Sequence, residues 1–237
     1  MRIGIVAPMA SELRPVIRAG RLHQTMMLGS CRVRRAEIGL LDVVAVRGGI
    51  GTRRAARVAE QLIVEANAQH VLVSGIAGGL SGDAHIGSLV VPATVLDLGT
   101  GATYEATPFG PVEPTGSVVT SDDLIVDPSG LAMLGARGHA AIDMETAAVA
   151  RVCHDQGVPW TAFRAVSDRV GEGVDEAIAA LARPDGSADL GGALRYVARR
   201  PWAIPRLARL GRGARLAAKV AADAAIEACR AWPGDPG

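Results

Sequence analysis

Lysine is nearly absent from this chain: Lys219 is the only one among 25 basic residues, and arginine supplies the rest. We attribute this skew to genome composition rather than to function. Aromatic residues make up only 3% of the 237 residues, and there are only three cysteines, Cys31, Cys153 and Cys229. Three scattered cysteines cannot all pair and lack metal-ligand spacing, so we expect neither a disulfide framework nor a structural metal. A reducing cytosol fits this cysteine usage.

Long apolar runs are also missing. The amino terminus offers only Ile3–Ala10 before Glu12, which is too short for a signal-peptide core with its cleavage site. No stretch reaches the roughly eighteen unbroken apolar residues of a membrane-spanning helix. The sequence therefore predicts a cytoplasmic protein that neither spans a membrane nor is exported by a visible signal.

The charge that is present is unevenly distributed. Apolar residues make up 49% and charged residues 21%, as in a globular α/β domain of this length. The net charge is only +1, yet residues 190–222 hold eight basic side chains and no acidic one. Because the basicity is local, it predicts a surface patch rather than a general nucleic-acid binder.

Hydrophobic periodicity predicts alternating strands and helices. The expected strands are Arg2–Ala7, Cys31–Ile38, Leu41–Arg47, His70–Ser74, Leu89–Leu98, Val118–Val126 and Val158–Val166. The expected helices are one beginning near Glu12 with Ser11 as its cap, Thr52–Ala66, Thr146–Gln156, Glu176–Ala182, Leu190–Val197 and an amphipathic one from Arg206. Turns or loops are expected at Gly75–Gly79, Gly99–Gly116 and Arg183–Gly186.

The stretch Ala140–Asp168 organises the rest of the chain. It carries two carboxylates one residue apart, Asp143 and Glu145, then a helix, and then a strand that ends in Ser167-Asp168. Ligands of open α/β sheets bind at the ends of strands. We therefore expect Glu145, Arg164 and Asp168 to converge on one cavity.

Four motifs in the same order resemble one family. Asp143-Met-Glu-Thr followed by Arg164-Ala-Val-Ser-Asp, together with Met1–Leu13, Gly49-Ile50-Gly51 and Gly75–Leu80, is similar to the purine nucleosidase and phosphorylase superfamily, in particular its methylthioadenosine/S-adenosylhomocysteine nucleosidase branch. The resemblance covers roughly residues 1 to 170. It implies a three-layer αβα sandwich of the nucleoside phosphorylase type, with a central mixed sheet flanked by helices, and a homodimer.

The resemblance also implies a role for each matching residue. Asp168 would protonate the departing adenine, oriented by Ser167, and Glu12 would activate a water molecule. Glu145 would accept hydrogen bonds from the ribose hydroxyls. The other implied contacts are Arg164 to the water and glutamates, Met144 to the sugar, the backbone of Ile125 to the adenine edge, Leu124 to the base, and Ile76, Ala77 and Gly78 at the glycine turn.

Structural alternatives exist for these residues. Ser167-Asp168 could be a helix-capping pair, and Glu12 a first-turn glutamate favoured by the helix dipole. Arg164 could form a structural ion pair with Glu145 or Asp143. A glycine-rich strand end can also be only a tight turn.

Several positions depart from the family pattern. Ile76 replaces a serine that positions the water, Leu124 replaces an aromatic residue that stacks on the base, and the segment around Gly99–Gly116 is shortened, which predicts a more open pocket. Related phosphorylases carry a Gly-Asp-x-x-Arg-like loop that Pro8–Glu12 lacks, and an arginine where Val73 stands. Arg53 and Arg54 are the remaining phosphate candidates, so hydrolysis is favoured over phosphorolysis. The five histidines share no ligand spacing, so we predict no metal and no cofactor.

The carboxy-terminal segment resembles a more specific family. Arg183-Pro-Asp-Gly, Arg199-Arg-Pro and Leu207-Ala-Arg-Leu-Gly-Arg look like the tail of the hopanoid-associated phosphorylases, which implies removal of adenine from adenosylhopane. We expect a nucleosidase-like α/β domain at 1–182 and a basic helical extension at 183–237. Basic residues interleaved with Trp202 and Ile204 across Arg199–Lys219 predict contact with the inner face of the cytoplasmic membrane. The alternative is a helix pair that packs on the core with a solvated arginine face, since the alanines at 217, 218, 221 and 222 would also pack against protein.

Three functions therefore compete. The first is hydrolysis of a lipid-carrying adenine nucleoside, and the second is cleavage of methylthioadenosine or S-adenosylhomocysteine. The third is a nucleoside-binding module without turnover. Retention of Glu12, Glu145, Arg164 and Asp168 argues against the third.

Overall fold

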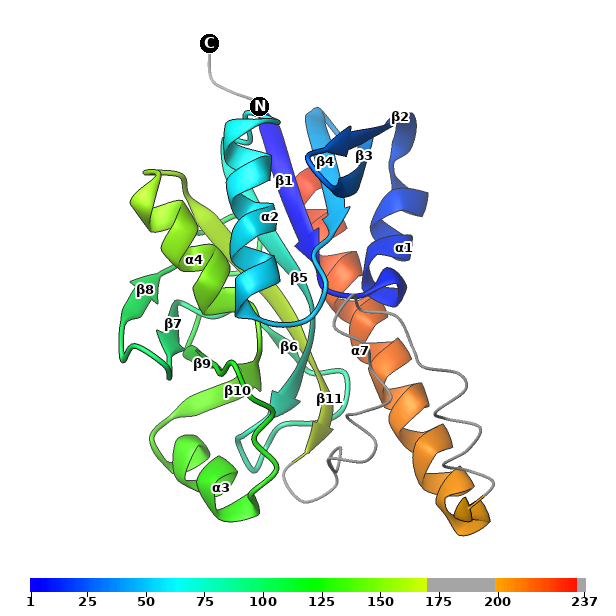
Figure 1. The fold of residues 1–237 in the computed structure, drawn as a ribbon, viewed down its shortest axis with the longest axis vertical. Helices are drawn as coiled ribbons and strands as arrows, with labels where there is room; N and C mark the ends of the chain where they lie inside the picture. Colours follow the sequence, from blue (N-terminus) through cyan, green and yellow to red (C-terminus); the bar gives the residue numbers. More distant parts are fainter. Residues whose placement is uncertain (170–198, 234–237) are drawn as a thin grey trace.

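A computed structural model describes residues 1–169 and 199–233 of the chain (Figure 1). Its strands are β1 (Arg2–Ala7), β2 (Arg21–Leu28), β3 (Cys31–Ile38), β4 (Leu41–Arg47), β5 (His70–Gly79), β6 (Leu89–Val90), β7 (Thr94–Asp97), β8 (Thr103–Glu105), β9 (Ser117–Thr120), β10 (His139–Asp143) and β11 (Trp160–Arg169). Its helices are α1 (Ala10–Ala19), α2 (Thr52–Val64), α3 (Pro128–Ala136), α4 (Thr146–Asp155), a 3₁₀ turn η1 (Pro201–Ala203) and α7 (Ile204–Arg230).

One mixed sheet holds all eleven described strands. The main order is β2-β3-β4-β1-β5-β10-β9-β7-β8, with β11 paired to β5 and to β6. The central pairs β4/β1, β1/β5 and β5/β11 are parallel, whereas β5/β10, β2/β3 and β3/β4 are antiparallel. Strand β5 is the hub, because it pairs with β1 through its first half, with β10 at its end and with β11 along its length.

Helices cover both faces of the sheet. On one face α2 and α4 pack together over apolar residues of β1, β4, β5 and β11. On the other face α1 and the second half of α7 cover a second cluster that includes Ile3, Leu72 and Phe163. The expected three-layer αβα sandwich with a mixed central sheet is confirmed.

Several expected boundaries are wrong. Helix α1 begins at Ala10, so Ser11 is not its cap; instead the Glu12 carboxylate accepts the backbone N–H of Met9. The expected strand Leu89–Leu98 is split into β6 and β7 around Pro92, which has no N–H to donate to a ladder. The strand expected over Val118–Val126 ends at Thr120, and the expected loop Gly99–Gly116 contains β8.

The glycine segment after His70–Ser74 is not a turn. β5 continues through Gly79, because Gly75 to Gly79 stay paired with β11 and the last two residues also pair with β10. The helices expected at Glu176–Ala182 and Leu190–Val197, the turn at Arg183–Gly186 and the domain boundary at 182/183 lie outside the described residues. The amphipathic helix expected from Arg206 is present as α7 and begins two residues earlier.

Candidate active site

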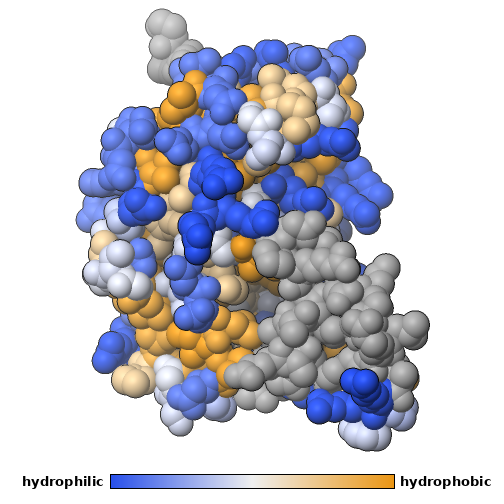
Figure 2. All heavy atoms as spheres, in the orientation of Figure 1, coloured by the Kyte–Doolittle hydropathy of each residue, from blue (hydrophilic) through white to orange (hydrophobic). Residues whose placement is uncertain are grey.

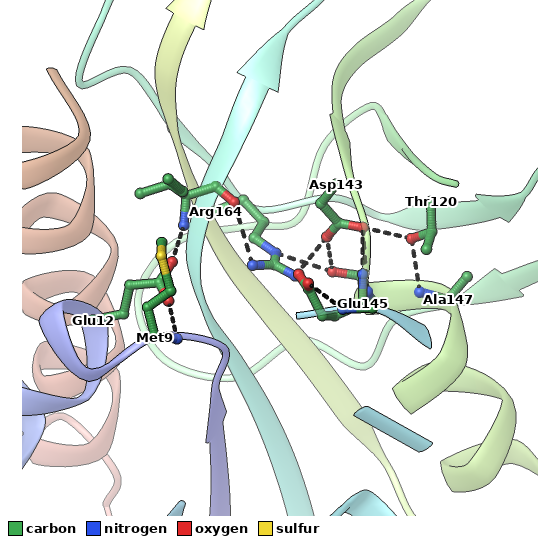
Figure 3. Close-up of polar contacts among 10 residues, drawn as sticks. Met9, Glu12, Thr120, Asp143, Glu145, Ala147 and Arg164 are labelled. Carbon is green, nitrogen blue, oxygen red and sulfur yellow. Dashed lines mark hydrogen bonds and ion pairs between the residues drawn. The ribbon is translucent and has the colours of Figure 1, made fainter. Parts of the chain in front are cut away.

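Three separate parts of the chain bring four charged side chains together beneath the sheet's covering helices. Glu12 comes from the first turn of α1, Arg164 from the middle of β11, and Asp143 and Glu145 from the junction of β10 and α4. Figure 3 shows the Glu12 carboxylate on one side of the Arg164 guanidinium and the Asp143–Glu145 pair on the other. All four side chains are buried.

Glu12 is held by backbone amides. Its Oε2 accepts the N–H of Met9 at 2.5 Å and its Oε1 accepts the N–H of Ile76 at 2.9 Å. The side chain is fully buried, and burial raises the pKa of Glu12 to about 7, although the Ile76 amide and Arg164 oppose the rise. A carboxyl group with this pKa exchanges protons near neutral pH, as a general base must.

Arg164 fixes the geometry of the cluster. Its Nη2 lies 2.6 Å from Asp143 Oδ2 and 3.1 Å from Glu145 Oε2. Its Nη1 donates to the carbonyl of Ile76 at 3.3 Å, and its Nε donates to Thr146 Oγ1 at 3.0 Å. Burial opposes the charge of this side chain, but the surrounding carboxylates raise its pKa, so it stays a cation. The structural ion pair weighed from the sequence is therefore present.

Asp143 is a residue that sequence reasoning noticed but did not place in the site. Its Oδ1 accepts from Thr120 Oγ1 at 2.6 Å and from the backbone N–H groups of Glu145 and Thr146. Oδ2 accepts the Thr146 hydroxyl and pairs with Arg164. With so many donors, Asp143 acts as the anchor that orients Arg164, and the Asp-x-Glu-Thr spacing was the available signal.

Each carboxylate oxygen of Glu145 accepts a hydrogen bond from a different donor. Oε1 accepts the backbone N–H of Gly51 at 3.1 Å, and Oε2 accepts from Arg164. Burial raises the pKa of Glu145, with Asp143 adding to the rise and Arg164 opposing it. The Gly49-Ile50-Gly51 turn thus connects to this carboxylate, and Gly51 has φ +99°, a conformation that favours glycine.

Gly75 makes room for the cluster. A Cβ built on Gly75 would lie 2.6 Å from Glu12 Oε1 and 2.7 Å from Arg164 Nη1. Any side chain here would push apart the two charged groups that face each other across β5. Close approach of side chains, rather than a turn, therefore explains this glycine.

Ser167 and Asp168 lie further along β11. Arg164 pairs with Gly75, and Asp168 pairs with Gly78, with a register shift between Val166 and Asp168 that leaves Ser167 as the extra residue. Such a bulge re-aims side chains at a strand end. Ser167 Oγ lies 2.5 Å from Asp168 Oδ1 and 3.3 Å from the carbonyl of Ala77, and Asp168 is half-buried. A helix-capping role is absent, because both residues are within the strand.

The other residues predicted to contact the substrate differ in how closely they approach the charged cluster and Asp168. The N–H and carbonyl of Ile76 hold Glu12 and Arg164. Its side chain packs against a buried alanine cluster formed by β11 and α7. Gly78 is half-buried, and a Cβ on it would lie 3.9 Å from Asp168 Oδ2. Met144, which stands between Asp143 and Glu145 in the sequence, is half-buried.

Leu124 and Ile125 follow β9 in an irregular segment rather than in the expected strand. Leu124 is 43% exposed and Val126 is 37% exposed, whereas Ile125 packs partly against Leu80 and Leu134. Figure 2 shows apolar side chains gathered on this face near the segment before α3. In the described part of the chain, no three His, Cys, Asp or Glu side chains are grouped as metal ligands.

The chain is similar to known proteins over most of its length. The family model described as "Phosphorylase superfamily" matches residues 2–128 and 110–188. The 5'-methylthioadenosine/S-adenosylhomocysteine nucleosidases of Aeromonas salmonicida and Bacillus thuringiensis are 27% and 25% identical over 203 residues, covering 73% of this chain and 88% and 87% of theirs.

Solved structures share the fold at lower identity. The S-adenosylhomocysteine nucleosidase of Streptococcus pyogenes superposes with a TM-score of 0.76 at 20% identity, covering 99% of this chain and 98% of that one. The futalosine hydrolase of Helicobacter pylori gives 0.72 at 18% identity, covering 96% and 97%. The family match spans more than half of the sequence, and so this chain belongs to the phosphorylase superfamily.

Proposed function

We propose that this protein hydrolyses the N-glycosidic bond of an adenine nucleoside. The observation that carries the proposal is Glu12: a fully buried carboxyl group, held by two backbone amides beside Arg164, with a pKa of about 7. The curated relatives bear the name of enzymes acting on methylthioadenosine and S-adenosylhomocysteine, both adenine nucleosides. Membership of the superfamily and this general base together favour an enzyme over a binding module.

The reaction follows from the charges in the site. Breaking the bond between the sugar carbon and adenine builds positive charge on the ribose and negative charge on the base. Glu145 accepts hydrogen bonds from the ribose hydroxyls and stabilises the cation. Glu12 takes a proton from a water molecule while the water oxygen bonds to the sugar carbon. The electron pair of the broken bond leaves with adenine, which receives a proton from Asp168. Ser167, 2.5 Å from Asp168 Oδ1, orients the acid.

Water rather than phosphate is the proposed nucleophile. Arg53 and Arg54, the phosphate candidates, are exposed on α2, and buried Val73 stands at the position of a phosphorylase arginine. In phosphate buffer we expect the sugar product to be a free reducing sugar. A ribose 1-phosphate derivative as the major product in the same assay would show that phosphate attacks instead.

For the substrate we propose an adenine nucleoside that carries a lipid, specifically adenosylhopane. The resemblance of the tail supports this choice, and so do exposed apolar side chains at Leu124 and Val126, beside the position predicted to meet the base. The second candidate, methylthioadenosine or S-adenosylhomocysteine, is favoured by the named relatives. Side-by-side incubation with adenosylhopane and methylthioadenosine, following adenine release, decides between them.

The outcomes of that assay are distinct. Preference for adenosylhopane in kcat/KM supports the lipid nucleoside, and preference for methylthioadenosine assigns the smaller substrate. Binding of either without adenine release would leave only the nucleoside-binding module. We also propose a homodimer at the cytoplasmic face of the membrane, and sedimentation equilibrium of the full chain measures its subunit number.

A further inference from the structure

The N-terminal part of α7 differs from its C-terminal part in what it contacts. From Gly213 onward α7 packs against β11, β5 and α1, and its inner side chains Ala217, Ala221, Ala225 and Cys229 are buried. Between Ile204 and Arg212 no residue of the helix is buried. Figure 1 shows this first part running beyond the end of β11. We call residues 201–216 the arm; its last turn, from Gly213, is the place where the helix meets β11.

The outer face of the arm is basic. Arg209, Arg212 and Arg215 recur every three residues, so they lie along one side of the helix, and all three are exposed. The described residues 199–222 contain no acidic side chain. Lys219 does not add to the free positive charge of this face, because it forms an ion pair with Asp223 one turn later.

Large apolar side chains are exposed on the same arm. Trp202 is 75% exposed, Ile204 is 49% exposed, and Leu216 is 49% exposed. Trp202 and Ile204 lie at the tip, where Pro201 and Pro205 begin η1 and α7. An exposed tryptophan beside arginines is the combination that membrane interfaces select, since the indole ring sits at the headgroup level while the basic groups meet anionic lipids.

The arm is also joined directly to the strand that carries Asp168. A Cβ on Gly213 would lie 2.6 Å from the carbonyl oxygen of Ser167, so the helix and β11 touch at this point. The arm therefore projects from the same end of the molecule at which β11 ends. A surface that holds the arm would lie close to the candidate active site.

We propose that the arm docks this protein on an anionic lipid bilayer, with Trp202 and Ile204 in the interface and Arg209, Arg212 and Arg215 against lipid headgroups. No described helix is long and apolar enough to cross a bilayer, so this attachment is peripheral. The inference goes beyond the proposed reaction and does not depend on which nucleoside is cleaved. The proposed contact region is also shorter than the Arg199–Lys219 segment expected from the sequence, because Ala217 and Ala218 of that segment are buried against the protein.

Flotation of the full chain with vesicles of phosphatidylcholine and phosphatidylglycerol tests the proposal. We expect flotation at low salt and its loss at high salt, where screening shortens the reach of charge. Arg209→Glu/Arg212→Glu/Arg215→Glu should lower the partition coefficient by at least roughly a hundredfold, since each basic residue near such a surface contributes roughly a factor of five and the new carboxylates are repelled. The matched control is Arg14→Glu/Arg57→Glu/Arg151→Glu, which changes the charge equally at exposed positions on α1, α2 and α4.

Trp202 supplies an independent readout. Its fluorescence should shift to the blue on adding vesicles, and Trp202→Phe should remove the shift while adenine release from a soluble nucleoside and the melting temperature stay unchanged. Three outcomes overturn the proposal: no flotation of the wild type at low salt, equal losses in the arm variant and the control, or tighter binding to duplex DNA than to the vesicles.

Discussion

At the scale of single residues, Glu12 links the site's geometry to pH. Its ordinary pKa of 4.5 is raised to about 7 by burial, so its ionised fraction falls as the pH drops below about 7. If Glu12 is the general base, kcat/KM should fall about tenfold per pH unit on the acid side of this value. A pH profile that stays flat through this range, measured with a substrate that does not titrate there, would contradict the role.

The same shift predicts a stability effect with a definite sign. The folded protein holds the Glu12 proton more tightly than the unfolded chain, so between pH 4.5 and about 7 stability falls as pH rises. Above about 7 the cost is complete, at roughly 3 kcal/mol for a shift of this size.

Glu12→Gln removes that cost and the base together. Its free energy of unfolding relative to the wild type should therefore improve as the pH is raised across this range, while adenine release drops on the order of a hundredfold or more. Chemical denaturation of both proteins at several pH values measures the first effect. A relative stability that is independent of pH would mean that Glu12 ionises normally in the folded protein.

At the scale of elements, the contact between α7 and β11 controls the position of the Ser167-Asp168 bulge. Gly213→Ala would place a methyl group 2.6 Å from the Ser167 carbonyl oxygen, which forces the helix or the bulge to move. We expect lower stability and at least a tenfold loss of turnover, because the acid shifts with the strand.

Gly211→Ala is the matched control for this contact. Apart from the helix's own backbone, no atom of the described residues lies within 4 Å of a Cβ built at Gly211, and alanine is the better helix former by roughly 0.5–1 kcal/mol. This variant should therefore be slightly more stable with normal turnover. If Gly213→Ala behaves like Gly211→Ala in thermal melts and adenine release, α7 does not position the acid.

At the scale of the whole molecule, the elements predicted well were those whose pattern is local. Strand β1, the β3–β4 hairpin and helix α4 could be read from hydrophobic periodicity and turn residues alone. The meeting of Glu145 with Arg164 could be anticipated as well, because the pattern placed both residues near the ends of strands, although Arg164 lies in the middle of β11.

What could not be predicted depends on contacts between distant segments. Position 75 is a glycine in an extended strand because Glu12 and Arg164 approach it from elsewhere in the chain. No local feature of the sequence distinguishes this reason for a glycine from a turn. The hydroxyl of Thr120 reaches Asp143 across two paired strands. Likewise, α7 is buried only where it lies against the sheet, and its first residues extend past the sheet as the arm. The hydrophobic periodicity of the helix does not reveal where the sheet ends.

The measurement that tests the central claim most directly is adenine release by Asp168→Asn compared with the wild type. The account predicts that the wild type releases adenine and that the variant folds and binds a nucleoside analogue normally but turns over on the order of a hundredfold more slowly, because the departing base is no longer protonated. Wild-type turnover by the variant, at an unchanged melting temperature, would remove Asp168 from the reaction and contradict the mechanism.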